Sequence, residues 1–504
     1  MSPATAEAPA TTEAPVPALA RPLLAVRDGV HQVPTPIRLG VAVVLALVVG
    51  YQVTGVAFDI VVAAGIGGVL LLGYLALHRF EWFIWVVLLV RPLLDLTKGE
   101  RGAGGSGHMA TMLGAAVLVA GIVWLAALSR ERHRLPMGAV SRALLLLTLS
   151  SLISVLHSAQ PLVSAAQMAR TTAAVVLFIV LEQLLRTRRL AMWTLVVCAL
   201  STIGPIGVAL FQLATGDGSK AQGVSRITGS FLHPNTFGFV LVIVLLMGYA
   251  LRRHVSRRAR WAIDALLVVS AVELLFTYSR GSWFVLVLGL LVLAVLAERR
   301  LFLVLPILGA GIYFFLTPVA SRVADLARED TVGGRPGNSA SWRLAHLEGL
   351  LAASDGLTLF GIGPKMADQL TEGSRAPHND AVRLFVENGA FGLVCYLLFL
   401  AALVLVACRA LRRLRTGFER GLAVGFAATV AAFLADSMGA NLITQFVSLI
   451  YVLGLTAVVQ AYVATADTAC PGNPNVSDPA CAAGDDRSEC PSTYVQSSAG
   501  QAKE

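Results

Sequence analysis

Charged residues are scarce in this chain of 504 amino acids. Asp, Glu, Lys and Arg together make up 14% of the sequence, against about 25% in an average soluble domain. Hydrophobic residues make up 56% and the mean hydropathy is +0.73. Apolar runs of about 17–25 residues, the length that crosses a bilayer, recur along the chain. The sequence therefore predicts an integral membrane protein rather than a soluble domain with one water-excluded core.

Several motifs of energy-coupled or metal-assisted chemistry are also absent. The chain has no Walker A phosphate loop, no HExxH zinc motif and no GxSxG nucleophile elbow. No predicted external loop carries the paired acids (DxD) of a metal-dependent transferase. These absences argue against an ATP-driven pump, and they predict that any transfer reaction proceeds without a metal or other cofactor.

Cysteine is rare, with six residues in the chain. Three fall in or beside predicted membrane segments, where a thiol acts as a small apolar group. The other three lie in the C-terminal tail, spaced too widely for a zinc motif. The long polar loop at 318–388 has none, so no disulfide is expected to hold it.

Fourteen apolar segments are predicted to span the membrane. They are residues 38–54, 57–77, 81–96, 109–128, 139–157, 161–184, 189–212, 235–251, 261–278, 281–298, 300–317, 389–408, 420–437 and 441–464. The third and fifth fit least well, because Arg91-Pro92 and a run of serines interrupt them. The expected fold is an all-α, polytopic membrane helix bundle with about 12–14 transmembrane helices over residues 37–464.

Two tails flank the predicted bundle. Residues 1–36 are rich in Ala, Pro and Thr and lack the pattern of a cleaved signal peptide. Residues 465–504 are polar and punctuated by Pro and Gly. We expect both tails to be disordered.

The positions of the basic residues orient the predicted bundle. The formal charge is +9, but most basic residues lie in short connections between apolar runs, which argues against nucleic-acid binding. The clusters are at 78–79, 129–134, 186–189, 252–260, 298–300 and 409–420. The positive-inside rule places all six in the cytoplasm. We therefore expect a multi-pass protein of the cell inner (cytoplasmic) membrane, with cytoplasmic termini and a large, partly helical external loop at 318–388.

Arginine is unusual on the predicted outer side, where Arg226, Arg280 and Arg343 fall. A guanidinium group binds phosphate oxygens through a planar fork. Because nucleotides are not supplied outside the membrane, a phosphate-bearing substrate there would be lipid-linked. The alternative is that each arginine caps a helix or contacts a lipid headgroup. Arg170, inside the sixth predicted span, is a further candidate, although pairing with a carboxylate such as Glu273 also explains it.

His378 is the candidate base within the large loop. It follows Pro377 and precedes a predicted short helix at 379–387 that Asn388-Gly389 should stop. The positive end of a helix dipole disfavours imidazolium, and a neutral imidazole can act as a general base. The alternatives are a capping role for His378, or Asp380 as the base.

Three other features of the loop are predicted. Residues 338–353 should form an amphipathic helix that places Arg343 beside His346. Residues 360–364 should form a tight glycine turn. Arg383 and Glu387, four residues apart, either serve the site or simply pair on a solvated helix face.

These fragments together resemble a known family. They are RxxGSFxHPN at 226–235, YSRGS at 278–282, Trp-Arg at 342–343, GIG at 361–363 and PHNDAVRLFVENGAFG at 377–392. Their content, order and predicted side of the membrane resemble the O-antigen ligase and polymerase family over about residues 165–410.

The resemblance implies a metal-independent transfer at the outer face of the membrane. The donor would be a glycan on undecaprenyl pyrophosphate, and the acceptor a sugar hydroxyl on another glycan or lipid-linked glycan. His378 would activate the hydroxyl, with Asn379 of the same motif and the loop residue Arg343 completing the catalytic set. The residues that would contact the pyrophosphate are Arg226 and Arg280, with Arg170 and Arg383 as further candidates.

Two other functions fit parts of the sequence. A flippase or permease for lipid-linked oligosaccharides would suit the many helices, but it needs charges along a path through the membrane rather than at one face. A peptidoglycan polymerase of the shape, elongation and division type would use an outer-loop acid, for which Asp380 is the candidate. Ligase and polymerase activity are not distinguished by the sequence.

Overall fold

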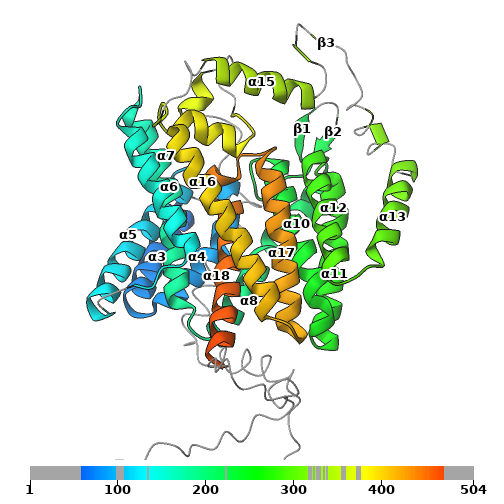
Figure 1. The fold of residues 1–504 in the computed structure, drawn as a ribbon, viewed down its shortest axis with the longest axis horizontal. Coiled ribbons are helices and arrows are strands. Elements are labelled where there is room, and N and C mark those ends of the chain that lie inside the picture. Colours follow the sequence, from blue (N-terminus) through cyan, green and yellow to red (C-terminus); the bar gives the residue numbers. More distant parts are fainter. Residues whose placement is uncertain are drawn as a thin grey trace, which may run out of the picture.

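The structure is a computed structural model. It describes residues 58–97, 107–132, 135–221, 224–315, 320–321, 324, 331–332, 335–336, 339–353, 359–370 and 376–469. The predicted span at 38–54, the N-terminal tail and residues 470–504 lie outside the described residues. Within them, long helices run roughly parallel to one another in a single bundle (Figure 1).

Helices follow one another along the chain, and most of the described ones are joined by short connections. The first half holds α3 (Phe58–His78), α4 (Phe80–Val90), the 3₁₀ helix η1 (Arg91–Thr97), α5 (Gly107–Arg132), α6 (Ala139–Val155), α7 (Pro161–Leu184), α8 (Arg188–Ser201) and α9 (Ile203–Thr215). The second half holds α10 (Pro234–Leu251), η2 (Arg252–His254), α11 (Arg257–Phe276), α12 (Arg280–Leu296), α13 (Leu301–Phe315), α15 (Ser339–Ala353), η4 (Met366–Gln369), α16 (Asp380–Arg413), α17 (Gly417–Ser437), η5 (Leu442–Thr444) and α18 (Phe446–Ala469).

The predicted all-α membrane bundle is confirmed. In the part of the chain that the structure describes, seven helices are long and apolar enough to cross a membrane. Three apolar helices are shorter, in α6, α12 and α13. The predicted span at 189–212 is divided at Thr202 into α8 and α9. The span at 81–96 changes from α-helix to 3₁₀ helix at Arg91, just before Pro92, which has no backbone N–H to donate.

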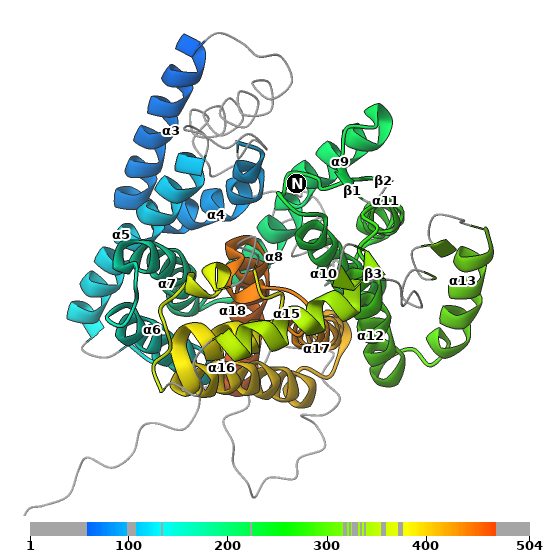
Figure 2. The ribbon, with the colours of Figure 1, turned by 90° about the horizontal axis from the view of Figure 1, so that it is seen from above.

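The interior of the bundle is filled by aromatic rings from three helices. Phe239 of α10, Phe399 of α16 and Phe433 of α17 are fully buried. The Phe433 ring lies 6.2 Å from each of the other two ring centroids. Seen along the bundle, α18 lies among the other helices, with α16 and α17 on one side of it (Figure 2). Large apolar side chains thus fix the positions of the helices whose ends carry the motifs.

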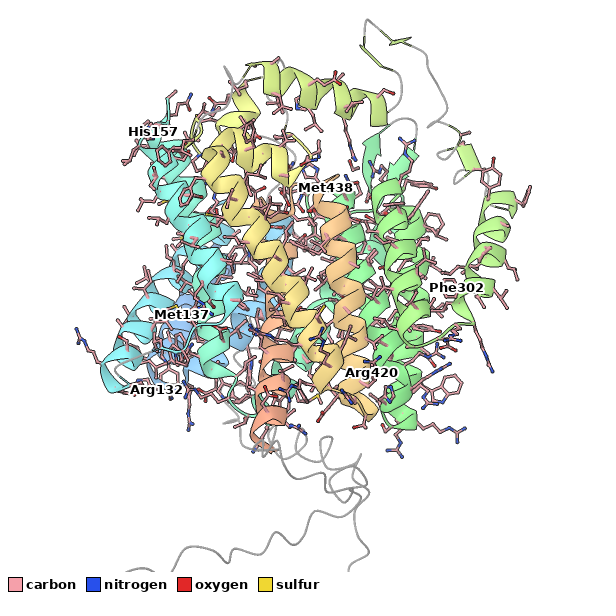
Figure 3. The ribbon with its side chains drawn as sticks, in the orientation of Figure 1. Arg132, Met137, His157, Phe302, Arg420 and Met438 are labelled. Atoms are coloured by element: carbon pink, nitrogen blue, oxygen red, sulfur yellow. The ribbon has the colours of Figure 1, made fainter. Side chains whose placement is uncertain are left out.

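The predicted basic connections gather at one end of the bundle, here called the basic face. Arg188 pairs with Glu419 at 2.6 Å, and Arg253 pairs with Glu298 at 2.8 Å. Arg420 donates to the Leu296 carbonyl at 3.4 Å. In Figure 3, Arg132 and Arg420 lie at the lower end, whereas His157 and Met438 lie at the upper end. The sequence grouped these connections correctly; the compartment that the basic face meets stays a prediction.

The opposite end, here called the motif face, carries the family motifs. The strands β1 (Ser219–Ala221) and β2 (Val224–Arg226) form an antiparallel hairpin there. A second small hairpin pairs β3 (Thr331–Val332) with β4 (Arg335–Pro336). The predicted amphipathic helix at 338–353 is confirmed as α15, which lies across the bundle at this end (Figures 1 and 2).

The short helix predicted at 379–387 begins at Asp380, and its helical geometry ends at Gly389, where φ is 72° and ψ is −170°. The predicted break at Asn388-Gly389 is confirmed. The apolar segment that was predicted as the span at 389–408 follows directly after the kink, and α16 comprises both helices up to Arg413.

The predicted glycine turn packs against this kink. Ile362 N donates to Val386 O at 3.1 Å, and Gly363 N donates to Glu387 O at 3.0 Å. Phe391 N donates to Leu359 O at 3.1 Å. The two backbones are so close that a Cβ added at Gly389 would lie 2.3 Å from the carbonyl carbon of Leu359. Glycine is therefore required there for both the positive φ and the contact.

We expect Gly389→Ala to lower the stability of the protein by about 2 kcal/mol or more, because the new methyl group meets backbone atoms and the φ is strained. Thermal unfolding of the purified protein in detergent measures this loss. Gly349→Ala is the matched control, since nothing lies within 4 Å of a Cβ at that position of α15. Equal unfolding temperatures for the two variants would contradict the proposed close contact.

Candidate active site

Among the described helices that begin at the motif face, three start at residues of the sequence motifs. They are α10 at Pro234, α12 at Arg280 and α16 at Asp380. Ser279 caps α12 through its hydroxyl, and Asn379 caps α16 by accepting from Val382 N at 3.0 Å. A helix N-terminus presents unpaired N–H groups and the positive end of its dipole. All three starts belong to segments that the sequence motifs had singled out.

Arg226 ties the first two motifs together. Its Nε donates to the Thr277 carbonyl at 2.8 Å, and its Nη2 donates to Asn235 Oδ1 at 3.2 Å. The Ser279 hydroxyl donates to the same Asn235 oxygen at 3.1 Å. These bonds join segments that lie about fifty positions apart in the sequence. Arg280 directly follows the capping residue Ser279 and lies in the first turn of α12.

His378 occupies a strained position immediately before α16. Its φ is 53°, in the left-handed region that non-glycine residues rarely adopt. The backbone is held by the next residue, because the Asn379 side chain caps α16 and also donates to the Met438 carbonyl at 3.2 Å. Asn379 therefore positions His378, since its side-chain oxygen accepts from Val382 N and its side-chain nitrogen donates to the Met438 carbonyl.

The electrostatic surroundings keep the imidazole of His378 neutral. Burial lowers its pKa to about 4, and the positive charges of Arg343, His233, Arg383 and His346 act in the same direction. At neutral pH the ring nitrogen can therefore accept a proton. The same interactions show that α10, α15 and α16 bring basic side chains within electrostatic range of one another.

His233 connects His378 to the first motif. Its pKa is lowered by burial and by the nearby charge of Arg226. It stands directly before α10 as His378 stands before α16. The sequence analysis quoted His233 within a motif but gave it no role, so the structure adds it to the site.

Arg343 reaches the end of α17 from α15. Its Nη1 lies 3.5 Å from the point where a Cβ on Gly439 would stand. Burial lowers the pKa of Arg343, and the nearby Asp436 carboxylate acts in the opposite direction. Asp436 in turn lies beside Gly281 of the second motif. Sequence reasoning missed Asp436, although an acid in an apolar span is a signal of function.

Asp380 makes a poor base in this geometry. Its side chain is fully buried and accepts from Ile443 N at 3.1 Å and from the Tyr396 hydroxyl at 3.3 Å. These bonds tie the start of α16 to the segment before α18. Of the two candidate bases, His378 is the one that the structure leaves partly exposed at the motif face.

Arg383 is placed differently from the other candidate arginines. It is buried, and its guanidinium binds Asp368 at 2.5 Å, Glu387 at 3.1 Å and Asn441 Oδ1 at 3.3 Å. All three of its nitrogens are thus used by the protein. The predicted contact with pyrophosphate does not fit this arrangement; the predicted pairing with Glu387 does, though in a buried network rather than on a solvated face.

Arg170 does not join the cluster either. It is exposed on α7, and no hydrogen bond or ion pair among the described residues links it to Arg226, Arg280 or Arg343. The carboxylate of Glu273, its suggested partner, is buried without a hydrogen-bond partner in the described part of the chain. The suggested pairing of Arg170 with Glu273 therefore does not form in the described part of the chain.

The serines of α6 form hydrogen bonds with the residues at the kink of α16. Asn388 donates to the hydroxyls of Ser150 at 3.2 Å and Ser151 at 2.7 Å, and Ser154 donates to the Glu387 carbonyl. Ser164 of α7 donates to the Pro364 carbonyl at 2.8 Å. The sequence analysis treated the serines as an interruption of a span, whereas they bind the kink in α16.

Residues 265–397 match the family model described as O-Antigen ligase. This segment of the chain is similar to the O-antigen ligase family. It runs from α11 into α16 and includes Arg280, Arg343 and His378, whereas Arg226 lies before it. A comparison with curated proteins finds no match.

The match confirms the resemblance that the motifs indicated, and it supports glycan transfer of the O-antigen ligase and polymerase type. Within the described residues, no group of three or more His, Cys, Asp or Glu side chains is arranged to hold a metal ion. The structure gives the geometry of the site residues, and their roles stay predictions.

The buried network of Arg383 predicts a structural phenotype. Arg383→Gln should lower stability by about 3–5 kcal/mol, because it leaves Asp368 and Glu387 without their shared cation. Thermal unfolding without any substrate measures this loss. Arg170→Gln is the control and should unfold like the parent protein. A stable Arg383→Gln protein with reduced donor affinity would instead return Arg383 to the substrate site.

Proposed function

We propose that this protein transfers or polymerises a glycan from an undecaprenyl-pyrophosphate-linked donor onto an acceptor sugar hydroxyl. The reaction takes place at the motif face, which is the outer face of the cytoplasmic membrane in this proposal. The observation that carries it is the gathering of a neutral imidazole, several guanidinium groups and three helix N-termini at one end of the bundle.

This arrangement fits a donor with two charged phosphates. Helix N-termini and arginines are the two protein features that bind phosphate oxygens most readily. Arg280 at the start of α12 and Arg226 beside it are assigned to the pyrophosphate. Arg343, brought in by α15, completes the binding surface. The positive groups would stabilise the charge that develops as the pyrophosphate departs.

In the proposed step the acceptor oxygen attacks the anomeric carbon of the donor sugar. A new glycosidic bond forms as the bond from that carbon to the pyrophosphate oxygen breaks. The hydroxyl proton passes to the free imidazole nitrogen of His378, and undecaprenyl pyrophosphate leaves with the bonding electron pair. No oxidant or reductant is needed.

The low pKa of His378 has a second consequence for this proposal. An imidazole with a pKa of about 4 is a weak base in the free protein. A bound pyrophosphate would offset the charge of Arg343 and so raise that pKa towards neutrality. The base would thus be strengthened only when the donor is in place, which limits unproductive proton uptake.

His378→Asn should reduce glycan transfer by about 10²–10⁴-fold, the usual contribution of a general base. Transfer is measured with purified protein, lipid-linked donor and acceptor. His78→Asn, an exposed histidine on the basic face, is the matched control and should keep full activity. Undiminished transfer by a folded His378→Asn protein would remove His378 from the mechanism.

The pH profile tests the electrostatic role of Arg343. In the parent protein kcat/KM, which reports the free enzyme, should fall only as the pH approaches 4, where His378 becomes protonated. Arg343→Gln removes a positive neighbour, so the pKa of His378 rises. The acidic limb should then move upward by roughly 0.5–1 pH unit, on top of any loss of rate.

Arg257→Gln on the basic face serves as the control for this profile and should leave the limb in place. An acidic limb that stays fixed or moves downward in Arg343→Gln would show that Arg343 does not act on the base.

A further inference from the structure

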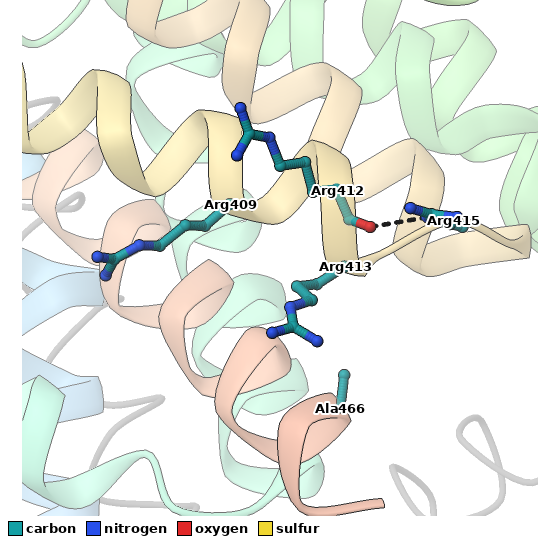
Figure 4. Close-up of a pocket in the computed structure, with 5 residues that line it drawn as sticks. All are labelled: Arg409, Arg412, Arg413, Arg415 and Ala466. Atoms are coloured by element: carbon teal, nitrogen blue, oxygen red, sulfur yellow. Dashed lines mark hydrogen bonds between the residues drawn. The ribbon is translucent and has the colours of Figure 1, made fainter. Parts of the chain in front are cut away.

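A second cluster of arginines lies at the opposite end of α16 from His378. Arg409, Arg412, Arg413 and Arg415 line a cavity of about 560 Å³ together with Ala466 of α18 (Figure 4). Because α16 is long and apolar enough to cross the membrane, this cavity meets the other membrane surface. It is therefore separate from the proposed transfer site.

Most of the charge in this cavity is not neutralised by the residues that the structure describes. Arg413 pairs with Asp467 at 3.2 Å. Arg415 donates to the carbonyl oxygen of Arg412, at 2.8 Å (Figure 4). No acidic side chain among the described residues forms an ion pair with Arg409, Arg412 or Arg415. The four exposed guanidinium groups that line the cavity provide positive charge for an anion, and guanidinium geometry suits phosphate oxygens.

The face of α16 that leads to the cavity is apolar and exposed. Val394, Leu397, Leu398, Val404 and Leu405 are each between 39% and 53% exposed. Together with the exposed Ala401, these residues recur every three or four positions along α16 and continue to Arg409 and Arg412, so all lie along one side of the helix. An exposed apolar stripe on a membrane helix meets acyl chains. Hydrocarbon contact and guanidinium groups therefore follow each other along a single face.

We propose that this face binds an anionic phospholipid. The phosphodiester headgroup would lie in the arginine cavity between the ends of α16 and α18, and the acyl chains would lie along the exposed stripe. The order of the two parts matches a lipid in the leaflet at the basic face. A free phosphate ion would use the same guanidinium groups but would gain nothing from the stripe.

The test compares lipid retention by full-length protein variants. Protein in detergent is mixed with phosphatidylglycerol or phosphatidylcholine, and bound lipid is counted by native mass spectrometry. The parent protein should retain phosphatidylglycerol in preference to phosphatidylcholine. The double variant Arg409→Gln/Arg412→Gln should lose at least about tenfold of this preference, since each arginine near an anionic headgroup contributes a several-fold gain.

Arg257→Gln/Arg258→Gln is the matched control, with the same charge change on exposed residues of the basic face away from the cavity. It should keep the preference. Arg409→Lys/Arg412→Lys keeps the charge and tests folding: it should retain part of the preference. An equal loss in the control pair, or an unchanged preference in Arg409→Gln/Arg412→Gln, would overturn the proposal.

Inorganic phosphate distinguishes the two sources of the anion. Added at about millimolar concentration, it should not displace phosphatidylglycerol from the parent protein, because it lacks the contacts with the stripe. Full displacement would identify a site for free phosphate and would also overturn the proposal. None of these readouts depends on glycan transfer, so they are independent of the proposed function.

Discussion

The close approach of two backbone segments is the constraint on which the motif face depends. The turn at 361–363 and the kink of α16 exchange backbone hydrogen bonds at distances that exclude a side chain on Gly389. The kink lets one helix both cross the membrane and place its first turn under α15. A straight helix would not bring the segment after His378 under α15 while the apolar segment packs in the bundle.

Buried charge holds the same region together from inside. Arg383 joins the start of α16 to the 365–369 turn through Asp368, and to the segment before α18 through Asn441. Serine hydroxyls from α6 and α7 bind the other side of the kink. A buried ion pair costs desolvation and gains specificity when fully satisfied. Here the network fixes where the first turn of α16 lies, and with it the position of His378.

The two ends of the bundle use positive charge in different ways. At the motif face the partly buried Arg343 lies within electrostatic range of a neutral imidazole, an arrangement that suits the turnover of a charged substrate. At the basic face they are exposed and line a cavity beside an apolar stripe, which suits a resident lipid. Both ends use the planar guanidinium group of arginine, which is partly buried at the motif face and exposed at the basic face.

Hydrophobic length and charge determined much of this protein from the sequence alone. The membrane bundle, the grouping of the basic connections, helix α15 and the family segment follow from patterns that act over one helix or one motif. Only the tertiary structure decided how each arginine is placed and which groups it contacts. Arg383 and Arg226 look alike in sequence, yet one is enclosed by two carboxylates and the other lies between two motifs. That difference depends on contacts between segments far apart in the chain, and no local pattern carries it.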